Sequence, residues 1–422
     1  MLPLVVPLAI FVATYGLLWA RRKGGPLLPV WAVFAVGGAA MVAAGAESLQ
    51  QAASSVDWQV LAFLFGMLVI STGLELSGEL EALSGRIVGH GRSPFRLMLL
   101  LSFGFGLASA VLMNDSLAIM GTPILIRYAR KVKVSPKPFL YGLAFAVTIG
   151  SVMTPMGNPQ NMVVALQSGM AEPLFTFLYY LLPFTLVDLG LLALILYFAF
   201  RKELLRAQPP EPLPGAARDA TLSKLSWSAL ALAVAGMAYS DVSRMTGVGP
   251  SPDIAEAALI GSLFLLLASR RRAELLRKTN WGVLAMFVGL FVFTEGVYRG
   301  GLLDVFSSYA AGATGSNVLL LMVTSSLLLS QLVSNVPTVI LMMPFFAPIL
   351  PSPVAGYWAA FAAASTLAGS LTVMGAASNL IVAEQSRKMG EGFSYGGFMK
   401  YGLPVTAVGV AVLLLALKLY GV

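Results

Sequence analysis

Apolar runs that could each cross a membrane alternate with short polar or basic segments along nearly the whole chain. A membrane-spanning helix needs about 20 predominantly apolar residues. The pattern predicts ten transmembrane helices, at about 2–20, 27–46, 58–76, from 138, 174–200, 225–240, 254–269, 281–298, from 355, and 398–420. We therefore expect an all-α polytopic membrane protein.

Two further apolar runs are each divided by a polar group. The first has arms at about 97–113 and 116–126, which meet at Asn114, Asp115 and Ser116. An Asp at the centre of a membrane helix costs roughly 2.5–3.5 kcal/mol on insertion scales, so an intramembrane Asp indicates function. The second run has arms at about 316–333 and 338–350, and its polar group contains Ser334, Asn335 and Thr338.

Each divided run could be one long kinked crossing or a re-entrant hairpin. The second arm of the first run is predicted to have about 11 residues, too few for a hydrocarbon core of about 30 Å. Basic residues flank this run on both sides: Arg86, Arg92 and Arg96 before it, and Arg127, Arg130, Lys131, Lys133 and Lys137 after it. A single crossing would place one cluster outside, whereas a hairpin keeps both inside, as the positive-inside rule favours. We therefore predict two hairpins.

Two of the transmembrane helices are interrupted near their middle. The segment 154–161 contains two Pro and one Gly and cannot stay α-helical, and 374–379 interrupts the run that starts near 355. Such interruptions free backbone carbonyl groups, which can line a protected polar cavity. The candidate ligands at the two breaks are Thr154, Gly157, Asn158, Gln160 and Asn161 in the first, and Ser378 and Asn379 in the second.

The chain repeats itself once. Asp57-Trp58 corresponds to Asn280-Trp281, and Met156-Gly157 corresponds to Met374-Gly375, with landmark offsets between 218 and 223 residues. Each half, 1–200 and 225–422, has five crossings plus one hairpin, and 201–224 is a polar cytoplasmic linker. Because five is odd, the second half should be inverted in the membrane, as in many secondary transporters. This arrangement places 24 of the 27 Lys and Arg in the cytoplasm and both termini outside.

Composition narrows the function. Only 11% of the residues are charged, against about 25% in soluble domains. The net charge of +8 fits cytoplasmic loops better than a nucleic-acid surface. The chain has no Cys and one His, so thiolate or multi-His metal sites and His-based membrane enzymes are not expected. We therefore expect that the protein is not an enzyme and that it uses no cofactor, apart from Na⁺ as a candidate coupling ion. We expect it in a prokaryotic inner or cell membrane as a multi-pass protein.

Two intramembrane acids are candidates for coupling to H⁺ or Na⁺. Asp115 is the only acid at a predicted tip, and a bare carboxylate there would repel an anion. It must be protonated, bind Na⁺, or face a cation or neutral solute; the alternative is a purely structural carboxylate held by backbone amides. Asp188 lies within the crossing 174–200, where a helix–helix hydrogen bond is an equally good explanation.

The tip and break motifs resemble those of the ion transporter superfamily. The matching residues are Met113-Asn114-Asp115-Ser116, Thr154 to Asn161, and Ser334-Asn335-Val336-Pro337-Thr338, and the most similar branch is that of arsenite-permease-like anion permeases. The resemblance implies a moving transport domain, an elevator-type motion and often a dimer, with Asn114, Asp115, Gly157 to Asn161, Ser334, Asn335, Ser378 and Asn379 at the site. Both tips depart from the Ser-Asn-Thr of the more distant divalent-anion:sodium symporters, which favours a neutral oxyacid over a dicarboxylate.

The sequence thus predicts a secondary active transporter of a small inorganic anion or an arsenite-like neutral oxyacid, coupled to H⁺ or Na⁺ by antiport or symport. The alternatives on the same scaffold are a Na⁺/H⁺ antiporter and a sodium-coupled carboxylate or sulfate symporter. The expected partners are the lipid bilayer and the solute, without nucleic acid. A homodimer and an ATPase partner subunit stay open, since the chain itself has no ATP-binding motif.

The hairpin prediction can be checked by labelling. Because the chain has no Cys, single Cys at Arg92 and at Lys133 can be tested with a membrane-impermeant maleimide in intact cells and inverted vesicles. Both positions should react from the cytoplasmic side only. Reaction from opposite sides would show that the segment between them crosses the membrane once.

Overall fold

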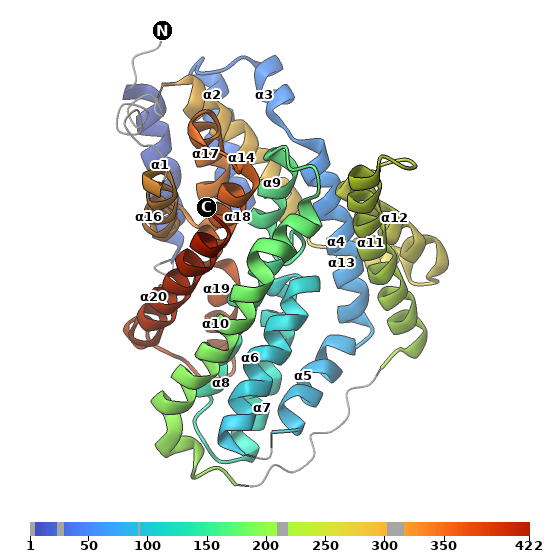
Figure 1. Cartoon of the computed structure of the whole chain (residues 1–422), viewed down its shortest axis with the longest axis vertical. Coiled ribbons are helices and arrows are strands. Elements are labelled where there is room, and N and C mark those ends of the chain that lie inside the picture. Colours follow the sequence, from blue (N-terminus) through green and yellow to red (C-terminus); the bar gives the residue numbers. More distant parts are fainter. Residues whose placement is uncertain (1–4, 23–28, 92, 209–217, 302–315) are drawn as a thin grey trace.

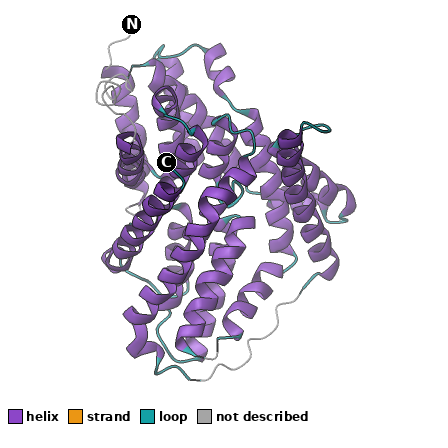
Figure 2. Cartoon of the chain, viewed as in Figure 1, coloured by secondary structure: helices purple, strands orange, loops and turns teal. Residues whose placement is uncertain are grey.

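The computed structural model describes residues 5–22, 29–91, 93–208, 218–301 and 316–422, without the side chains of 19–22 and 316. Every regular element in this part of the chain is a helix (Figure 2). Six helices are long and apolar enough to cross a membrane, and seven shorter apolar helices accompany them. The all-helical, multi-pass architecture predicted from the sequence is confirmed.

In the described part of the first half, five helices precede the first hairpin. These are α1 (Val5–Arg22), α2 (Val30–Ala43), α3 (Leu49–Ser55), α4 (Trp58–Leu76) and α5 (Glu79–Gly89). The hairpin and broken helix follow as α6 (Pro94–Val111), α7 (Asn114–Lys131), α8 (Lys137–Gly150) with the 3₁₀ turn η1 (Ser151–Met153), α9 (Pro159–Gln167) and the long α10 (Pro173–Leu204).

The second half follows the same order. It contains α11 (Ala220–Thr246), α12 (Ile254–Ala268), α13 (Arg272–Lys278), α14 (Trp281–Arg299), α16 (Ser316–Val333), α17 (Asn335–Phe346) with the 3₁₀ turn η2 (Ala347–Ile349), α18 (Val354–Ala368), α19 (Ala377–Lys388) and α20 (Tyr395–Leu419). Residues 302–315, between α14 and α16, lie outside the described part.

The structure corrects two expectations about element boundaries. The second arm of the first hairpin, α7, has 18 residues rather than about 11, because the helix continues through the basic segment Arg127–Lys131. The linker is shorter than 201–224, because α10 extends to Leu204 and α11 begins at Ala220. Residues 209–217 of that linker lie outside the described part.

Three short helices were not predicted: α3, α5 and α13. They have 7 to 11 residues and are too short or too polar to appear as crossings. A capping box of Ser48 and Gln51 starts α3, and this local motif could have revealed the helix in the sequence.

The packing of the two halves is pseudo-symmetric. In the first half α6 packs on α8, and in the second α16 packs on α18. Other pairs join the halves: α2 packs on α14 as α12 packs on α4, and α7 packs on α19 as α17 packs on α9. Each broken helix therefore completes its packing with the hairpin of the other half.

Glycines allow the closest of these exchanged contacts. A Cβ at Gly66 of α4 would lie 2.6 Å from the Ala258 carbonyl oxygen of α12. The corresponding Gly289 of α14 would place a Cβ 2.7 Å from the Ala35 backbone nitrogen of α2. Small residues let membrane helices approach to backbone contact, so the same glycine makes the same contact in each half.

The helices α6 and α7 form a hairpin in shape. In Figure 1 both run through the lower part of the molecule, and the N-terminus of α6 and the C-terminus of α7 lie at the same end. The ion pair between Arg127 of α7 and Glu81 of α5 supports this view, because α5 directly precedes α6. The placement of this hairpin relative to the bilayer stays a prediction.

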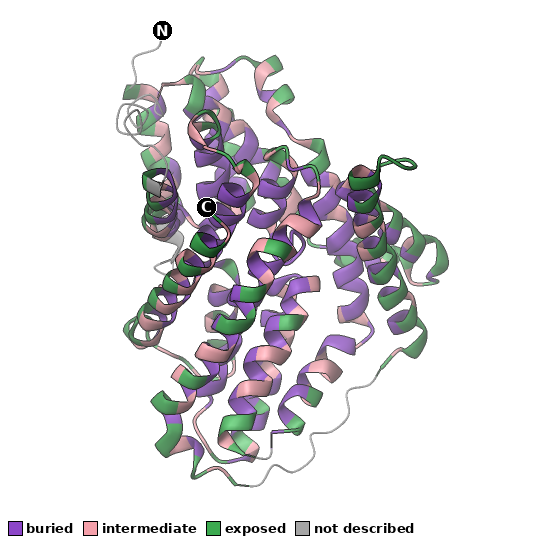
Figure 3. Cartoon of the chain, in the orientation of Figure 1, coloured by how far each residue is buried: buried purple, intermediate pink, exposed green. Residues whose placement is uncertain are grey.

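The core of the molecule is built around α8 and α18. Every residue of α8 from Pro138 to Gly150 is buried, as is every residue of α18 from Gly356 to Ala368. Figure 3 shows this buried interior surrounded by partly exposed outer helices. The two breaks directly follow these two central helices; residues 154–158 of the first are buried, whereas the second is partly exposed at Thr372 and Met374.

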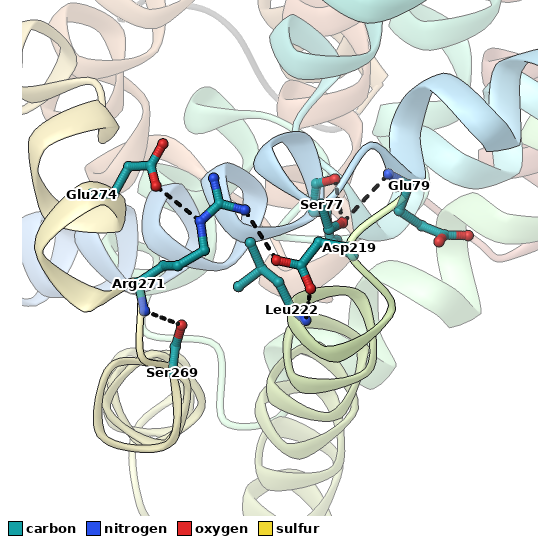
Figure 4. A network of polar contacts seen from close by, with 8 residues as sticks. Ser77, Glu79, Asp219, Leu222, Ser269, Arg271 and Glu274 are labelled. Atoms are coloured by element: carbon teal, nitrogen blue, oxygen red, sulfur yellow. Dashed lines mark hydrogen bonds and ion pairs between the residues drawn. The ribbon is translucent and has the colours of Figure 1, made fainter. Parts of the chain in front are cut away.

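A polar network fixes the end of the linker to the first half (Figure 4). Asp219 caps α11, donates its N–H to the Ser77 carbonyl oxygen at 3.0 Å, and pairs with Arg271 at 3.1 Å. The hydrogen bond from the Leu222 N–H, together with Arg271, holds the pKa of Asp219 below its usual value. Arg271 also pairs with Glu274 of α13 at 2.8 Å, so three segments are joined at one point.

Candidate functional site

The tip of the first hairpin lies against the first break. The Asn114 N–H donates to the Gly157 carbonyl oxygen at 3.3 Å. A Cβ at Gly157 would lie 2.4 Å from the Ser151 carbonyl oxygen, so only glycine fits there. The second tip lies beside the end of α18, since Asn335 Nδ2 is 3.0 Å from the ideal Cβ position of Gly369, which precedes the predicted break 374–379. Each predicted tip is thus next to the broken helix of its own half.

One asparagine in each half holds the interrupted backbone. Asn161 Nδ2 lies 2.9 Å from the Ser151, 3.1 Å from the Val152 and 3.0 Å from the Thr154 carbonyl oxygen. Buried carbonyl groups that lack a partner cost free energy, and in a membrane they must be satisfied within the protein. Asn161, predicted as a ligand, is therefore first of all the brace of the first break.

The second half uses the same brace. Asn379 Nδ2 lies 2.7 Å from the Gly369 and 3.3 Å from the Thr372 carbonyl oxygen. The donor and both acceptors are each displaced by 218 residues from Asn161, Ser151 and Thr154. The pseudo-symmetry therefore extends from the helix order to single hydrogen bonds.

A threonine ties each break to the first arm of its hairpin. The Thr154 hydroxyl donates to the Ala110 carbonyl oxygen, and the Thr372 hydroxyl donates to Gln331 Oε1 at 2.7 Å. Gln331 Nε2 in turn donates to the Ala368 carbonyl oxygen at 2.8 Å. Sequence reasoning missed Thr372 and Gln331, although Thr372 follows Thr154 by the repeat offset that was already visible.

Asn158 and Gln160, the other two side-chain amides of the first break, also make hydrogen bonds. Asn158 caps α9 through the Asn161 N–H, and its Nδ2 lies 3.0 Å from Ser151 Oγ. Asn158 and Gln160 also donate to Thr366 Oγ1 of α18, at 3.3 and 3.2 Å. Thr366 and Ser151 were not predicted; no spacing or motif in the sequence distinguishes them from packing residues.

Several buried oxygen atoms near the tips and the second break have no hydrogen-bond partner in the described part of the chain. They are Asn114 Oδ1, Asn335 Oδ1, Ser370 Oγ, Ser378 Oγ and Asn379 Oδ1. Unsatisfied buried polar atoms are rare in folded proteins and indicate a ligand, ion or water. The tips and the second break therefore offer buried oxygen atoms without a partner, whereas the described first break has none that is fully buried.

The same region contains helix N-termini without side-chain caps. The N-cap positions of α7, α17 and α19 make no side-chain cap hydrogen bond, whereas Asn158 caps α9. At the second tip the N-cap is Ser334, with a left-handed φ of +74°, and its carbonyl oxygen accepts the Thr338 hydroxyl at 2.8 Å. The uncapped N–H groups give each of these ends a partial positive charge.

Asp115 and Ser116 lie in the first turn of α7 and are both partly exposed. Ser116 Oγ lies 2.7 Å from Ser71 Oγ of α4, which links the tip to an outer helix. The Asp115 carboxylate has no hydrogen bond or ion pair with any other described residue. No Lys or Arg is buried in the described ranges, so this carboxylate lacks a fixed buried counter-charge.

Asp188 does not join the tips. It is buried in α10 and faces α20, where a Cβ at Gly409 would lie 2.7 Å from its Oδ2. This Oδ2 and the buried Thr406 Oγ1 of α20 have no hydrogen-bond partner among the described residues.

A polar cavity of about 600 Å³ lies in another part of the molecule, with Gln59, Arg244 and Asp253 in its wall. None of the predicted site residues lines this cavity.

Paired hairpins and broken helices around buried oxygen atoms, within a bundle of apolar helices, define a multi-pass membrane transporter rather than an enzyme. The chain belongs to the CitMHS family, described as citrate transporters, whose model matches residues 16–368. This family assignment agrees with the predicted transport function at the level of the class.

Three similar proteins are named as transporters or membrane proteins, and each match covers most of both chains. The chain is 28% identical to the silicon efflux transporter LSI3 of Oryza sativa subsp. japonica, over 94% of this chain and 96% of the relative. It is 27% identical to a 46 kDa membrane protein of Mycobacterium leprae, over 97% and 96%. The fold is similar to that of the Alcanivorax borkumensis YdaH transporter, with a TM-score of 0.62, 18% identity and coverage of 88% and 87%.

The asparagine brace can be tested by its removal. Asn161→Ala leaves the Val152 and Thr154 carbonyl groups without a described donor, at about 1–3 kcal/mol for each group that stays unsatisfied. The Ser151 carbonyl oxygen keeps Asn158 Nδ2 as a donor. We expect a clear fall in the melting temperature of the detergent-purified protein, larger than that of Asn379→Ala. That variant removes the described donor of the Gly369 carbonyl oxygen only, since the Gly375 N–H still donates to the Thr372 carbonyl oxygen. Asn317→Ala, at an exposed position of α16, is the control, and equal melting of all three variants would contradict the brace.

Proposed function

We propose that this protein is a secondary active transporter of a small, hydroxyl-bearing inorganic oxyacid, arsenite-like in chemistry and neutral when bound. The single observation that carries the proposal is the hydrogen-bonding balance of the site. The side-chain N–H donors of Asn158, Gln160, Asn161 and Asn379 are engaged with protein acceptors. The buried side-chain atoms of the site that lack a partner in the described part of the chain are amide oxygens and hydroxyls.

A neutral oxyacid complements this balance. Each of its hydroxyl groups can donate to an amide oxygen such as Asn335 Oδ1, and can accept from an uncapped N–H of α17 or α19. A fully charged anion could use the N–H groups only, and it would meet the Asp115 carboxylate without a buried Lys or Arg to offset the repulsion.

The relatives point in the same direction. One of them is named a silicon efflux transporter, and silicic acid is a neutral polyhydroxyl solute. The family description names citrate instead, and the uncapped N-termini of α7, α17 and α19 are the feature that favours an anionic substrate as the second candidate. A Na⁺/H⁺ antiporter on the same scaffold would use the free oxygen atoms for the cation alone.

We further propose Asp115 as the residue that couples transport to H⁺ or Na⁺. Its carboxylate is at the tip, has no described partner, and can change between protonated, Na⁺-bound and free forms as the site opens. Asp188 is the second candidate, but it faces α20 rather than a tip. The proposal holds for either direction of transport. It also requires neither a homodimer nor an ATPase subunit.

A substrate panel in proteoliposomes tests the proposal. Silicic acid, arsenite, citrate and sulfate should be offered under separate H⁺ and Na⁺ gradients, and we expect transport of a neutral oxyacid that depends on one gradient. In Asp115→Asn this gradient dependence should be lost, whereas Asp188→Asn should keep it. Citrate transport alone would support the second candidate, and gradient-driven Na⁺ or H⁺ flux without any solute would indicate the antiporter.

An elevator-type motion should move the first tip past α4. Replacing Ser71 and Ser116, whose hydroxyl oxygens are 2.7 Å apart, by Cys creates a disulfide in a chain without other Cys. We expect oxidation of the double variant to stop transport and reduction to restore it. The two single variants, treated in the same way, are the controls. Full transport by the oxidised double variant would show that the tip and α4 move together.

A further inference from the structure

The two breaks have the same backbone brace but differ in their buried atoms that lack a partner, and a threonine of the second half, Thr366, contributes to this difference. Thr366 of α18 is fully buried. Its hydroxyl donates to Asn161 Oδ1 at 3.1 Å and accepts from Gln160 Nε2 at 3.2 Å and Asn158 Nδ2 at 3.3 Å. A hydroxyl has one donor and two acceptor positions, so Thr366 is saturated by the first break.

The corresponding residue of the first half behaves differently. Thr148, displaced by 218 residues from Thr366, donates to the Ala144 carbonyl oxygen of its own helix at 2.8 Å. This bond to the preceding turn is the usual one for threonine inside a helix. No hydroxyl of α8 therefore reaches the second break, where Asn379 Oδ1 and Ser378 Oγ have no described partner.

The side chains of the second break are also smaller. Ala376 and Ser378 stand where the first break has Asn158 and Gln160. The N-terminus of α19 is consequently uncapped, whereas Asn158 caps α9. One break is closed by its own amides and Thr366, and the other keeps both its N–H groups and its oxygen atoms available.

We infer that Thr366 is a positioning residue that closes the first break, so that only the second break and the two tips contact the transported solute. The inference rests on the proposed function, in which the solute binds between the tips and the breaks. Thr366 acts through Asn158, Gln160 and Asn161 and does not contact the solute, because its hydroxyl has no free position. It also joins α9 of one half to α18 of the other, which holds the two halves of the core together.

The test compares Thr366→Val, Thr366→Ser and the matched control Thr148→Val. Val removes the hydroxyl with little change of volume, and Ser keeps it. Hydrogen exchange of the protein in nanodiscs should rise at 154–161 in Thr366→Val but not at 372–379, and Thr366→Ser should restore protection. Thr148→Val should change neither segment, because the Ala144 carbonyl oxygen keeps its helical backbone hydrogen bond.

Transport supplies the second readout. For the oxyacid that the wild type carries, silicic acid or arsenite, we expect Thr366→Val to raise KM at least tenfold, with Thr366→Ser and Thr148→Val within about threefold of the wild type. Unchanged exchange at 154–161 would overturn the closing role whether or not the wild type carries either solute. Increased exchange with an unchanged KM would overturn the positioning role and leave Thr366 a purely structural residue.

Discussion

The interrupted backbone of two central helices is the constraint on which the rest of this structure depends. The helices α8 and α18 are buried over nearly all their length, and each ends in a segment that cannot satisfy its own carbonyl groups. A membrane offers no water to replace the lost bonds. The protein solves the problem with one amide in each half, Asn161 and Asn379, and both amides come from the helix that continues after the break.

The brace explains why the two halves exchange contacts. Once the carbonyl groups are satisfied from within each half, the outer surface of α9 and α19 is free to receive the hairpin of the other half. The tips then approach the breaks closely enough for the Asn114 N–H to reach the Gly157 carbonyl oxygen. Buried oxygen atoms without a described partner thus lie near the tips and the second break.

Pseudo-symmetry does not make the two halves equal in chemistry. Asn161 and Asn379 keep the same role because they bind backbone carbonyl groups that both halves share. Thr154 and Thr372 both tie a break to the first arm of its hairpin, but Thr154 binds a backbone carbonyl oxygen and Thr372 binds the side chain of Gln331. The residues that face the shared centre have diverged, as Gln160 and Ser378 show. A duplicated scaffold keeps the residues that satisfy its backbone, whereas the side chains at other positions can diverge.

The sequence by itself determined the class of protein, the positions of the tips and breaks, and the correspondence between the halves. These features depend on apolar run length, Pro and Gly positions and repeated motifs, which are local properties of the chain. The short helices α3, α5 and α13 and the true length of α7 were missed, because polar helices at the ends of spans leave no apolar signal.

Only the tertiary structure showed which polar residues serve the backbone and which keep free atoms. Asn161 and Asn335 are equally prominent in the sequence, yet all polar atoms of the Asn161 side chain are bonded, whereas Asn335 Oδ1 has no described partner. Thr366 is decisive at the first break, although it lies in an Ala-rich helix with no motif around it. Hydrogen bonds between residues about 200 positions apart depend on how the two halves pack, and no local pattern encodes that.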